Sequence, residues 1–253
     1  MGLDIYAGTL TRYYTRNWKT VTQQFSEQYG FNYKVIRQSE DGQREQTARA
    51  DDVYNIVCQW KSRIENYIGS GDKWTEDYDK TPYYTDKPDW DAYTALRLVI
   101  AFKSRGKEIP KTVKKGFSCE DIDGFGEIYS HIKGQSVLLD GCEMYVPLFR
   151  DAYFEYVNPA MEKSRISTSL ALMEELDRIN SNIWGADRQT IMSWTTDEGY
   201  PVEVTSDENG RIIHKTTQTD EYDTQSLAKF AFSIMFRACE FSLKNGACLV
   251  LDF

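Results

Sequence analysis

Aromatic side chains alternate with carboxylates between Gly71 and Tyr93, and this stretch has the most distinctive chemistry in the chain. It holds seven carboxylates and two prolines. Tyrosine and tryptophan offer large, rigid contact areas, and carboxylates attract Arg or Lys on a partner, so this composition is typical of a protein-binding surface. The residues that we expect to contact a basic protein partner are Trp74, Asp77, Tyr78, Asp79, Tyr83, Tyr84, Asp86 and Trp90.

The same stretch supports other interpretations. Long ordered loops are often packed by their own side chains, so the aromatic residues could instead fold back as a lid on the core. Stacking against a sugar or a cationic ligand would use the same side chains. The loop could also complete an interface between copies of the chain, and the sequence leaves the oligomeric state open.

Residues suited to acid–base or metal chemistry are few. The two histidines are His131 and His214. Glu127 and His131 are four positions apart and would share one helical face, as two metal ligands can, but no second pair has a similar spacing. A metal at Glu127 and His131 is therefore the weaker alternative to a structural histidine. Two acids near adjacent strand ends, Asp4 and Asp252, could also hold a metal or act as acid and base.

Other motifs with catalytic meaning are partial or missing. The acidic run from Glu120 to Glu127 lacks the late bidentate Glu of a calcium loop, which favours the solvated start of a helix. Acidic neighbours raise a thiol pKa, so we do not expect Cys119 to act as a nucleophile with His131. The sequence has no nucleophile elbow, phosphate-binding loop, dinucleotide-binding glycine pattern or H-E-x-x-H. We therefore expect no cofactor and favour a non-enzymatic protein.

Size and charge set the class of protein. The 253 residues are 41% hydrophobic and carry a net charge of −9. That charge argues against a general nucleic-acid binder and favours a basic partner, and no apolar run reaches the roughly 20 residues that span a membrane. The opening residues lack the basic region and apolar core of a secretion signal. The five cysteines are irregularly spaced, which favours reduced thiols in a cytoplasm.

Apolar periodicity and turn residues predict one α+β domain over residues 1–253. Apolar residues at helical spacing, with capping residues before and glycines after, predict about five packed helices. These lie between Asn17 and Gly30, Asp51 and Gly69, Asp89 and Gly106, Ser167 and Gly185, and Asp223 and Gly246. The acidic and aromatic loop, 71–91, joins the second of these helices to the third.

The predicted strands include both ends of the chain. Short alternating or apolar runs indicate strands at Leu3–Ala7, Phe31–Arg37, Tyr153–Val157 and Ala247–Phe253, the last in the middle of a mixed sheet. Asp140-Gly141 and Asn209-Gly210 each predict a β-hairpin, because these pairs supply the positive φ angles of a tight turn. The second hairpin is polar and is expected at an exposed edge.

Three segments together carry a resemblance. The opening Met-Gly-Leu-Asp-Ile-Tyr-Ala-Gly-Thr-Leu-Thr-Arg-Tyr-Tyr, the segment from Tyr84 to Trp90 and the final Leu-Asp-Phe resemble a family of uncharacterised bacterial cytoplasmic proteins. The resemblance spans the chain and implies a bacterial intracellular origin, but it transfers no activity and no site residue. We therefore expect an acidic recognition protein that binds a basic partner, as immunity proteins bind toxins. The alternative is a metal- or small-ligand-binding enzyme with its pocket under the 71–93 loop.

Overall fold

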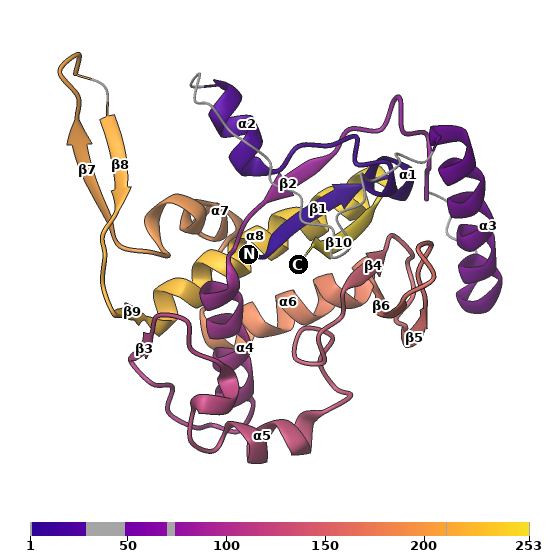
Figure 1. Ribbon diagram of the computed structural model, residues 1–253. Helices are drawn as coiled ribbons and strands as arrows, with labels where there is room; N and C mark the ends of the chain where they lie inside the picture. Colours follow the sequence, from indigo (N-terminus) through magenta and orange to yellow (C-terminus); the bar gives the residue numbers. More distant parts are fainter. Residues whose placement is uncertain (1, 29–48, 70–73, 211, 253) are drawn as a thin grey trace, which may run out of the picture. The chain divides into compact units, whose positions relative to one another are not determined.

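The computed structural model describes residues 2–28, 49–69, 74–210 and 212–252 (Figure 1). It is a mixed structure of helices and strands, as the sequence predicts, and it divides into two compact units. We call them the sheet unit (Asp4–Lys87, Cys142–Met173 and Ala238–Phe253) and the helical unit (chiefly Pro88–Gly141 and Glu174–Arg237). The boundary falls inside two long helices. The single-domain organisation stays a prediction.

The sheet unit contains a six-stranded mixed sheet with the order β2-β1-β10-β4-β6-β5. Every neighbouring pair is antiparallel except β4 with β6. The strands are β1 (Asp4–Gly8), β2 (Tyr84–Asp86), β4 (Met144–Val146), β5 (Tyr153–Val157), β6 (Lys163–Thr168) and β10 (Cys248–Asp252). The N-terminal strand and the buried, central C-terminal strand confirm the predicted sheet.

In the described part of the chain, three helices lie wholly within the sheet unit: α1 (Leu10–Tyr14), α2 (Val21–Gln28) and α3 (Ala50–Ile68). The long helix α3 buries Val53, Val57, Trp60 and Ile64, which recur at the helical spacing. Ile56 and Tyr67, which the apolar pattern also places on the buried face, are exposed. These buried residues join Tyr6, Trp74 and residues of β4, β6 and β10 in one apolar cluster. The predicted strand Phe31–Arg37 lies outside the described residues.

The helical unit contains α4 (Trp90–Ser104), α5 (Phe125–Ile132), α7 (Arg188–Asp197), a short 3-10 helix (Cys119–Asp121), and the parts of α6 (Ser169–Ile183) and α8 (Thr224–Asn245) that fall in it. Four of the predicted helices end within two residues of the expected glycines, Gly69, Gly106, Gly185 and Gly246, whereas Gly30 lies outside the described residues. Helix α5 begins within the acidic run. Helices α1 and α7 were not expected. Most of α4 is buried, as its nearly continuous apolar sequence predicts.

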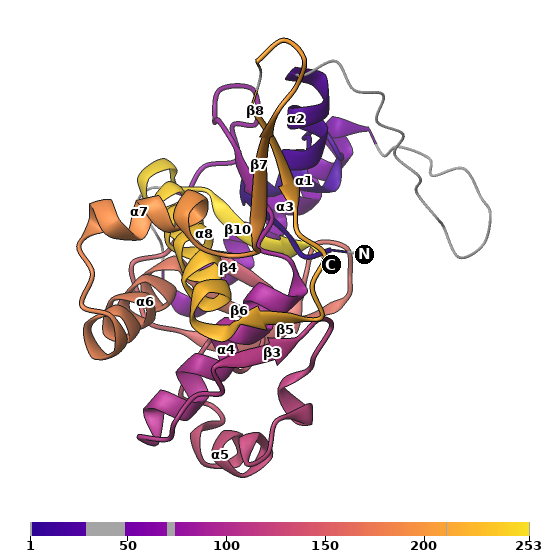
Figure 2. The ribbon, with the colours of Figure 1, turned by 90° about the vertical axis from the view of Figure 1, so that its left-hand side faces the viewer.

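Two small antiparallel sheets complete the helical unit. Strand β3 (Thr112–Lys114) pairs with β9 (Glu221–Asp223), and β7 (Val202–Ser206) pairs with β8 (Ile212–Thr216). The second pair is the predicted hairpin at Asn209-Gly210, with Gly210 at a φ of +75° and all of β7 exposed. Figures 1 and 2 show β7 and β8 as a two-stranded ribbon.

The hairpin predicted at Asp140-Gly141 is wrong. Residues 137–141 lie in turns, and β4 pairs with β10 and β6 instead of with the residues before it. The backbone N–H groups of Val137 and Leu138 donate to the carboxylate of Glu175, so they are not available to a strand ladder. A carboxylate far along the chain therefore overrides the local turn signal.

No helix in the described part of the chain is long and apolar enough to cross a membrane. All five cysteines are free, and four of them are buried.

Candidate partner-binding site

A buried carboxylate fixes the start of the predicted recognition loop. The side chain of Glu76 is almost fully buried and accepts hydrogen bonds from Leu10 N (3.3 Å), Thr11 N (3.1 Å), the Thr11 hydroxyl (3.1 Å) and the indole N–H of Trp74 (3.1 Å). Burial raises the pKa of this carboxyl, and the four donors partly oppose that rise. The loop is thereby tied to α1.

Arg12 of α1 holds the middle of the same loop. Its Nη1 donates to the carbonyl oxygen of Thr81 at 2.7 Å, and its Nη2 donates to the carbonyl oxygen of Tyr78. The guanidinium also lies 5.2 Å from the centre of the Tyr83 ring. Because a guanidinium presents several donors in one rigid plane, a single side chain can fix two carbonyl groups.

Two of the predicted contact residues pack inward. Trp74 is only 6% exposed, and its ring meets that of Trp60 edge to face at 5.8 Å between centroids. Tyr83 is half-buried and stacks on Tyr6 at 6.1 Å. This part of the stretch covers the core, as the lid interpretation expects.

The remaining predicted residues of the sheet unit lie at or near the surface. Asp77 and Asp79 are exposed in a turn, and Asp77 pairs with Lys80 at 3.0 Å, which lowers the pKa of Asp77. Tyr78 is half-buried and meets the ring of Tyr54 at 6.1 Å. In β2, the Tyr84 hydroxyl donates to Asp86 at 2.6 Å. Among the predicted contact residues of the sheet unit, the two turn acids are therefore the exposed ones.

Trp90, the last predicted contact residue, belongs to the helical unit and lines a pocket there. It begins α4 and is 40% exposed. The pocket has a volume of about 330 Å³. Its lining residues are Asp89, Trp90, Asp91, Lys115, Tyr200, Thr216 and Tyr222. We call this the Trp90 pocket.

Aromatic rings and carboxylates converge in the Trp90 pocket. The rings of Tyr200 and Tyr222 meet edge to face at 5.1 Å. Burial, followed by the charges of Asp89 and Asp91, raises the pKa of the Tyr200 phenol, so both carboxylates act on the same point. Both oxygens of Asp91 accept the N–H of Gly116, at 3.0 and 3.1 Å, which fixes this side chain.

The backbone of Asp89 is strained. This residue has a φ of +60°, a conformation that costs a side-chain-bearing residue free energy. Sequence reasoning singled out the stretch that holds Asp89, Trp90 and Asp91, but it missed the two tyrosines. Tyr200 and Tyr222 lie more than a hundred positions further along the chain, and no sequence motif near them indicated a binding site.

Only some of the residues that the alternative interpretation as an enzyme would use lie close together in the structure. Asp4 stands directly opposite Asp252 in the β1–β10 ladder, so these two acids are neighbours, as expected. Asp252 accepts the hydroxyl of Tyr13 at 2.5 Å and lies 3.6 Å from Arg16. Asp252 is therefore held in a local network of the sheet unit.

The other candidates for chemistry are less suited to it. His131 uses Nδ1 in a 2.8 Å contact with the carbonyl oxygen of Glu127 on its own helix. Among the described residues, no group of three or more His, Cys, Asp or Glu side chains could hold a metal ion. Burial raises the pKa of Cys119 to about 12, which disfavours the thiolate that a nucleophile requires.

Comparisons of the chain with protein-family models, with curated proteins and with solved structures found no match in any of the three. The resemblance to a bacterial family stays a prediction. The chemistry of the Trp90 pocket is therefore the basis for inferring a function.

Proposed function

We propose that this protein is a non-enzymatic acidic recognition protein that binds a basic protein partner. The observation that carries the proposal is the Trp90 pocket, where an exposed indole, two tyrosine rings and two carboxylates line one cavity, against the single cation Lys115. In this proposal the partner inserts a Lys or Arg side chain there. Neutralisation of a basic toxin in a bacterial cytoplasm is the form of this function that we favour.

The chemistry of the pocket suits a cationic side chain. A cation near the face of an aromatic ring is attracted by its quadrupole, and a carboxylate beside it adds a charge-assisted hydrogen bond. Asp89 and Asp91 supply the carboxylates, while Trp90 supplies accessible aromatic surface. The positive φ of Asp89 also supports a functional role, because backbone strain is concentrated at binding sites.

Charge over the rest of the chain supports the same partner. A net charge of −9 attracts basic proteins at long range and raises their association rate. The exposed acids Asp77 and Asp79 give the sheet unit negative charges of its own. Trp74 has a different role in this proposal, since its buried ring supports the loop rather than touching the partner.

Binding of a short basic peptide tests the proposal. The probe is a hexalysine peptide, with hexa-(acetyl-lysine) as the uncharged control, followed by calorimetry at low and high salt. We expect saturable hexalysine binding that weakens as salt rises, and no binding of the acetylated peptide. Replacing Trp90 by Ala, or Asp89 and Asp91 together by Asn, should weaken binding about tenfold.

A charge-matched variant separates the pocket from general charge. Glu120→Gln with Asp123→Asn removes two exposed acids that do not line the Trp90 pocket. We expect this double variant to bind hexalysine within about twofold of wild type. Equal weakening by both double variants, or hexalysine binding that does not change in Trp90→Ala, would overturn the proposal.

A further inference from the structure

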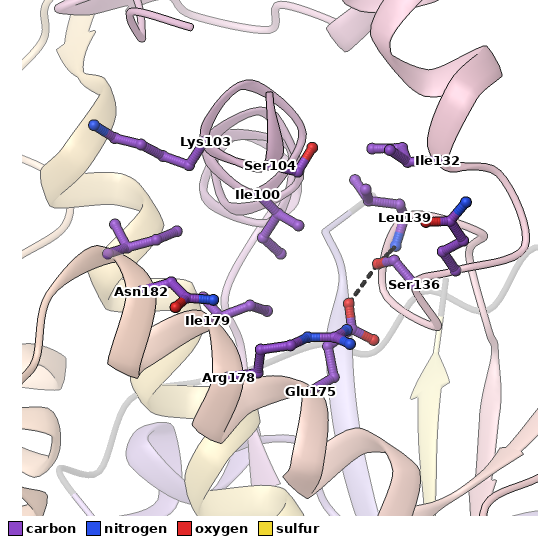
Figure 3. A pocket seen from close by; sticks show the side chains of 12 residues that line it. Ile100, Lys103, Ser104, Ile132, Ser136, Leu139, Glu175, Arg178, Ile179 and Asn182 are labelled. Atoms are coloured by element: carbon purple, nitrogen blue, oxygen red, sulfur yellow. Dashed lines mark hydrogen bonds between the residues drawn. The ribbon is translucent and has the colours of Figure 1, made fainter. Parts of the chain in front are cut away.

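A second cavity of the helical unit lies between α4, α6 and the turn that follows α5 (Figure 3). Its volume is about 380 Å³, within the range of small-molecule sites. Its lining residues are Ile100, Lys103, Ser104, Ile132, Gln135, Ser136, Leu139, Glu175, Arg178, Ile179, Asn182 and Ile183. We call it the Glu175 pocket. It shares no residue with the Trp90 pocket.

Hydrogen bonds to Glu175 make one wall of this pocket rigid. The carboxylate is buried and accepts the hydroxyl of Ser136 and the backbone N–H groups of Val137 (2.8 Å) and Leu138 (3.4 Å). Ser136 in turn accepts the N–H of Leu139 at 3.0 Å. The turn is therefore anchored to α6, and the cavity is formed before any ligand arrives.

The body of the pocket is aliphatic. Ile100 from α4 and Ile179 from α6 face each other across the space, and Ile132 and Leu139 lie along its other side (Figure 3). Branched aliphatic side chains offer dispersion contacts and no hydrogen bonds, so they favour a saturated hydrocarbon segment of a ligand.

The rim of the pocket is cationic. Lys103 and Arg178 both line it and are exposed. Neither side chain forms a hydrogen bond or a close ion pair with another described residue, although the charge of Arg178 acts on the Glu175 carboxyl and lowers its pKa against the larger effect of burial. Glu175 is the only carboxylate among the described lining residues, and its oxygens already accept three protein donors. Two cations against one acid leave the lining positive whether or not Glu175 is ionised, in a protein whose net charge is −9.

From this combination we infer that the Glu175 pocket binds a small organic anion with an aliphatic body, of the class of medium-chain carboxylates. The hydrocarbon part lies against Ile100, Ile132 and Ile179, and the anionic head is held at the rim by Arg178 or Lys103. The amides of Gln135 and Asn182 offer further donors to the head group. This inference is independent of the function proposed for the Trp90 pocket.

Octanoate below its micellar concentration is the probe, and octanol and octylammonium are the matched controls with the same chain. Heteronuclear NMR titration of the full chain reports both affinity and location. We expect saturable shifts at residues of the Glu175 pocket with octanoate, at least fivefold weaker binding of octanol, and none of octylammonium. No saturable shift with octanoate, or equal binding of octanol, would overturn the inference.

Variants test the two parts of the pocket separately. Lys103→Gln with Arg178→Gln should weaken octanoate binding about tenfold, whereas the charge-matched Lys111→Gln with Lys163→Gln, outside the lining, should leave it within about twofold. Asn182→Trp, at an exposed rim position, fills the cavity and should abolish binding while preserving the unfolding temperature. The inference is wrong if the two charge variants behave alike or if the filled pocket still binds octanoate.

Discussion

One carboxylate oxygen of Glu76 accepts hydrogen bonds from both the backbone N–H and the hydroxyl of Thr11, at 3.1 Å each, although the two residues lie 65 positions apart. This contact joins the first turn of α1 to the loop that carries most of the predicted contact residues. The loop is therefore positioned by a tertiary contact rather than by local sequence alone. The buried Glu76 holds the segment that carries the exposed acids Asp77 and Asp79.

Replacing Glu76 by Gln should destabilise the sheet unit. The amide NH₂ would face donor groups that now meet a carboxylate oxygen, which leaves buried N–H groups without an acceptor. We expect a loss of about 2–3 kcal/mol in the free energy of unfolding, measured with urea. Asp79→Asn on the exposed turn is the matched control, with an expected change within about 0.5 kcal/mol. Equal effects of the two substitutions would contradict the anchoring role of Glu76.

Replacing Arg12 by Lys should loosen the loop while keeping the charge. A lysine ammonium cannot reproduce the planar fork that reaches the carbonyl groups of Tyr78 and Thr81 together. We expect about 1–2 kcal/mol of local destabilisation, seen as faster hydrogen exchange in residues 77–86. Arg63→Lys on the exposed face of α3 should leave exchange in these residues unchanged.

Replacing Trp74 by Ala should destabilise the protein much more than replacing Trp90 by Ala, although both residues lie in the same stretch of sequence. Trp74→Ala removes a buried indole that packs on Trp60 and should cost about 3–5 kcal/mol of unfolding free energy. Trp90→Ala removes a ring that is 40% exposed and should cost about 1 kcal/mol or less. Thermal unfolding of both variants checks this, and a comparable loss in Trp90→Ala would show that its ring is structural.

Much of the fold follows from local sequence because its main elements have wide, regular apolar surfaces. The buried stripe of α3, the nearly all-apolar α4 and the terminal strand β10 are each specified within one segment. Helix α7 was missed because only Ile191 and Trp194 of its ten residues are buried. Strand β2 was missed because three residues of a polar loop become a strand only by pairing with β1.

The candidate sites were less predictable than the fold. Sequence predicted Trp90 as a contact residue and placed Asp89 and Asp91 in the same unusual stretch without assigning them a role, but Tyr200 and Tyr222 reach the pocket only through the tertiary fold. The same reason explains the false hairpin signal at Asp140-Gly141. A turn motif is local, whereas the carboxylate of Glu175 that captures the neighbouring N–H groups comes from another helix.

A side chain at Gly199 should destabilise the protein, both through backbone strain and through a steric clash. A substitution at Gly134, where only the strain applies, distinguishes the two effects. The φ of Gly199 is +106°, and an added Cβ would lie 2.9 Å from a ring carbon of Phe230. Gly134 has a φ of +79° but open space around it. We expect Gly134→Ala to cost about 1 kcal/mol from backbone strain alone, and Gly199→Ala to cost about 2–4 kcal/mol from strain and overpacking together. Equal losses in urea unfolding would show that Phe230 moves aside freely.

The raised pKa of the Glu175 carboxyl should be detectable in the pH dependence of the unfolding free energy. Burial raises the pKa of this carboxyl above the value of about 4.3 for an exposed Glu, so the folded protein keeps a proton that the unfolded chain releases. The stability that this group contributes is therefore present below pH about 4 and is lost as pH rises through the folded-state pKa. Glu175→Gln cannot titrate, so the unfolding free energy of wild type minus that of the variant should fall as pH rises.

The stability contribution of Asp187 should change with pH in the opposite direction, so Asp187 serves as the control for Glu175. Its carboxylate caps α7 by accepting the N–H of Thr190 at 2.7 Å, which lowers its pKa. The stability that it contributes is present above the ordinary Asp pKa of about 3.9 and is lost as pH falls through the folded-state value. The unfolding free energy of wild type minus that of Asp187→Asn should therefore rise with pH. Urea unfolding across a pH series measures both differences, and slopes of the same sign for the two variants would show that burial does not control the protonation of Glu175.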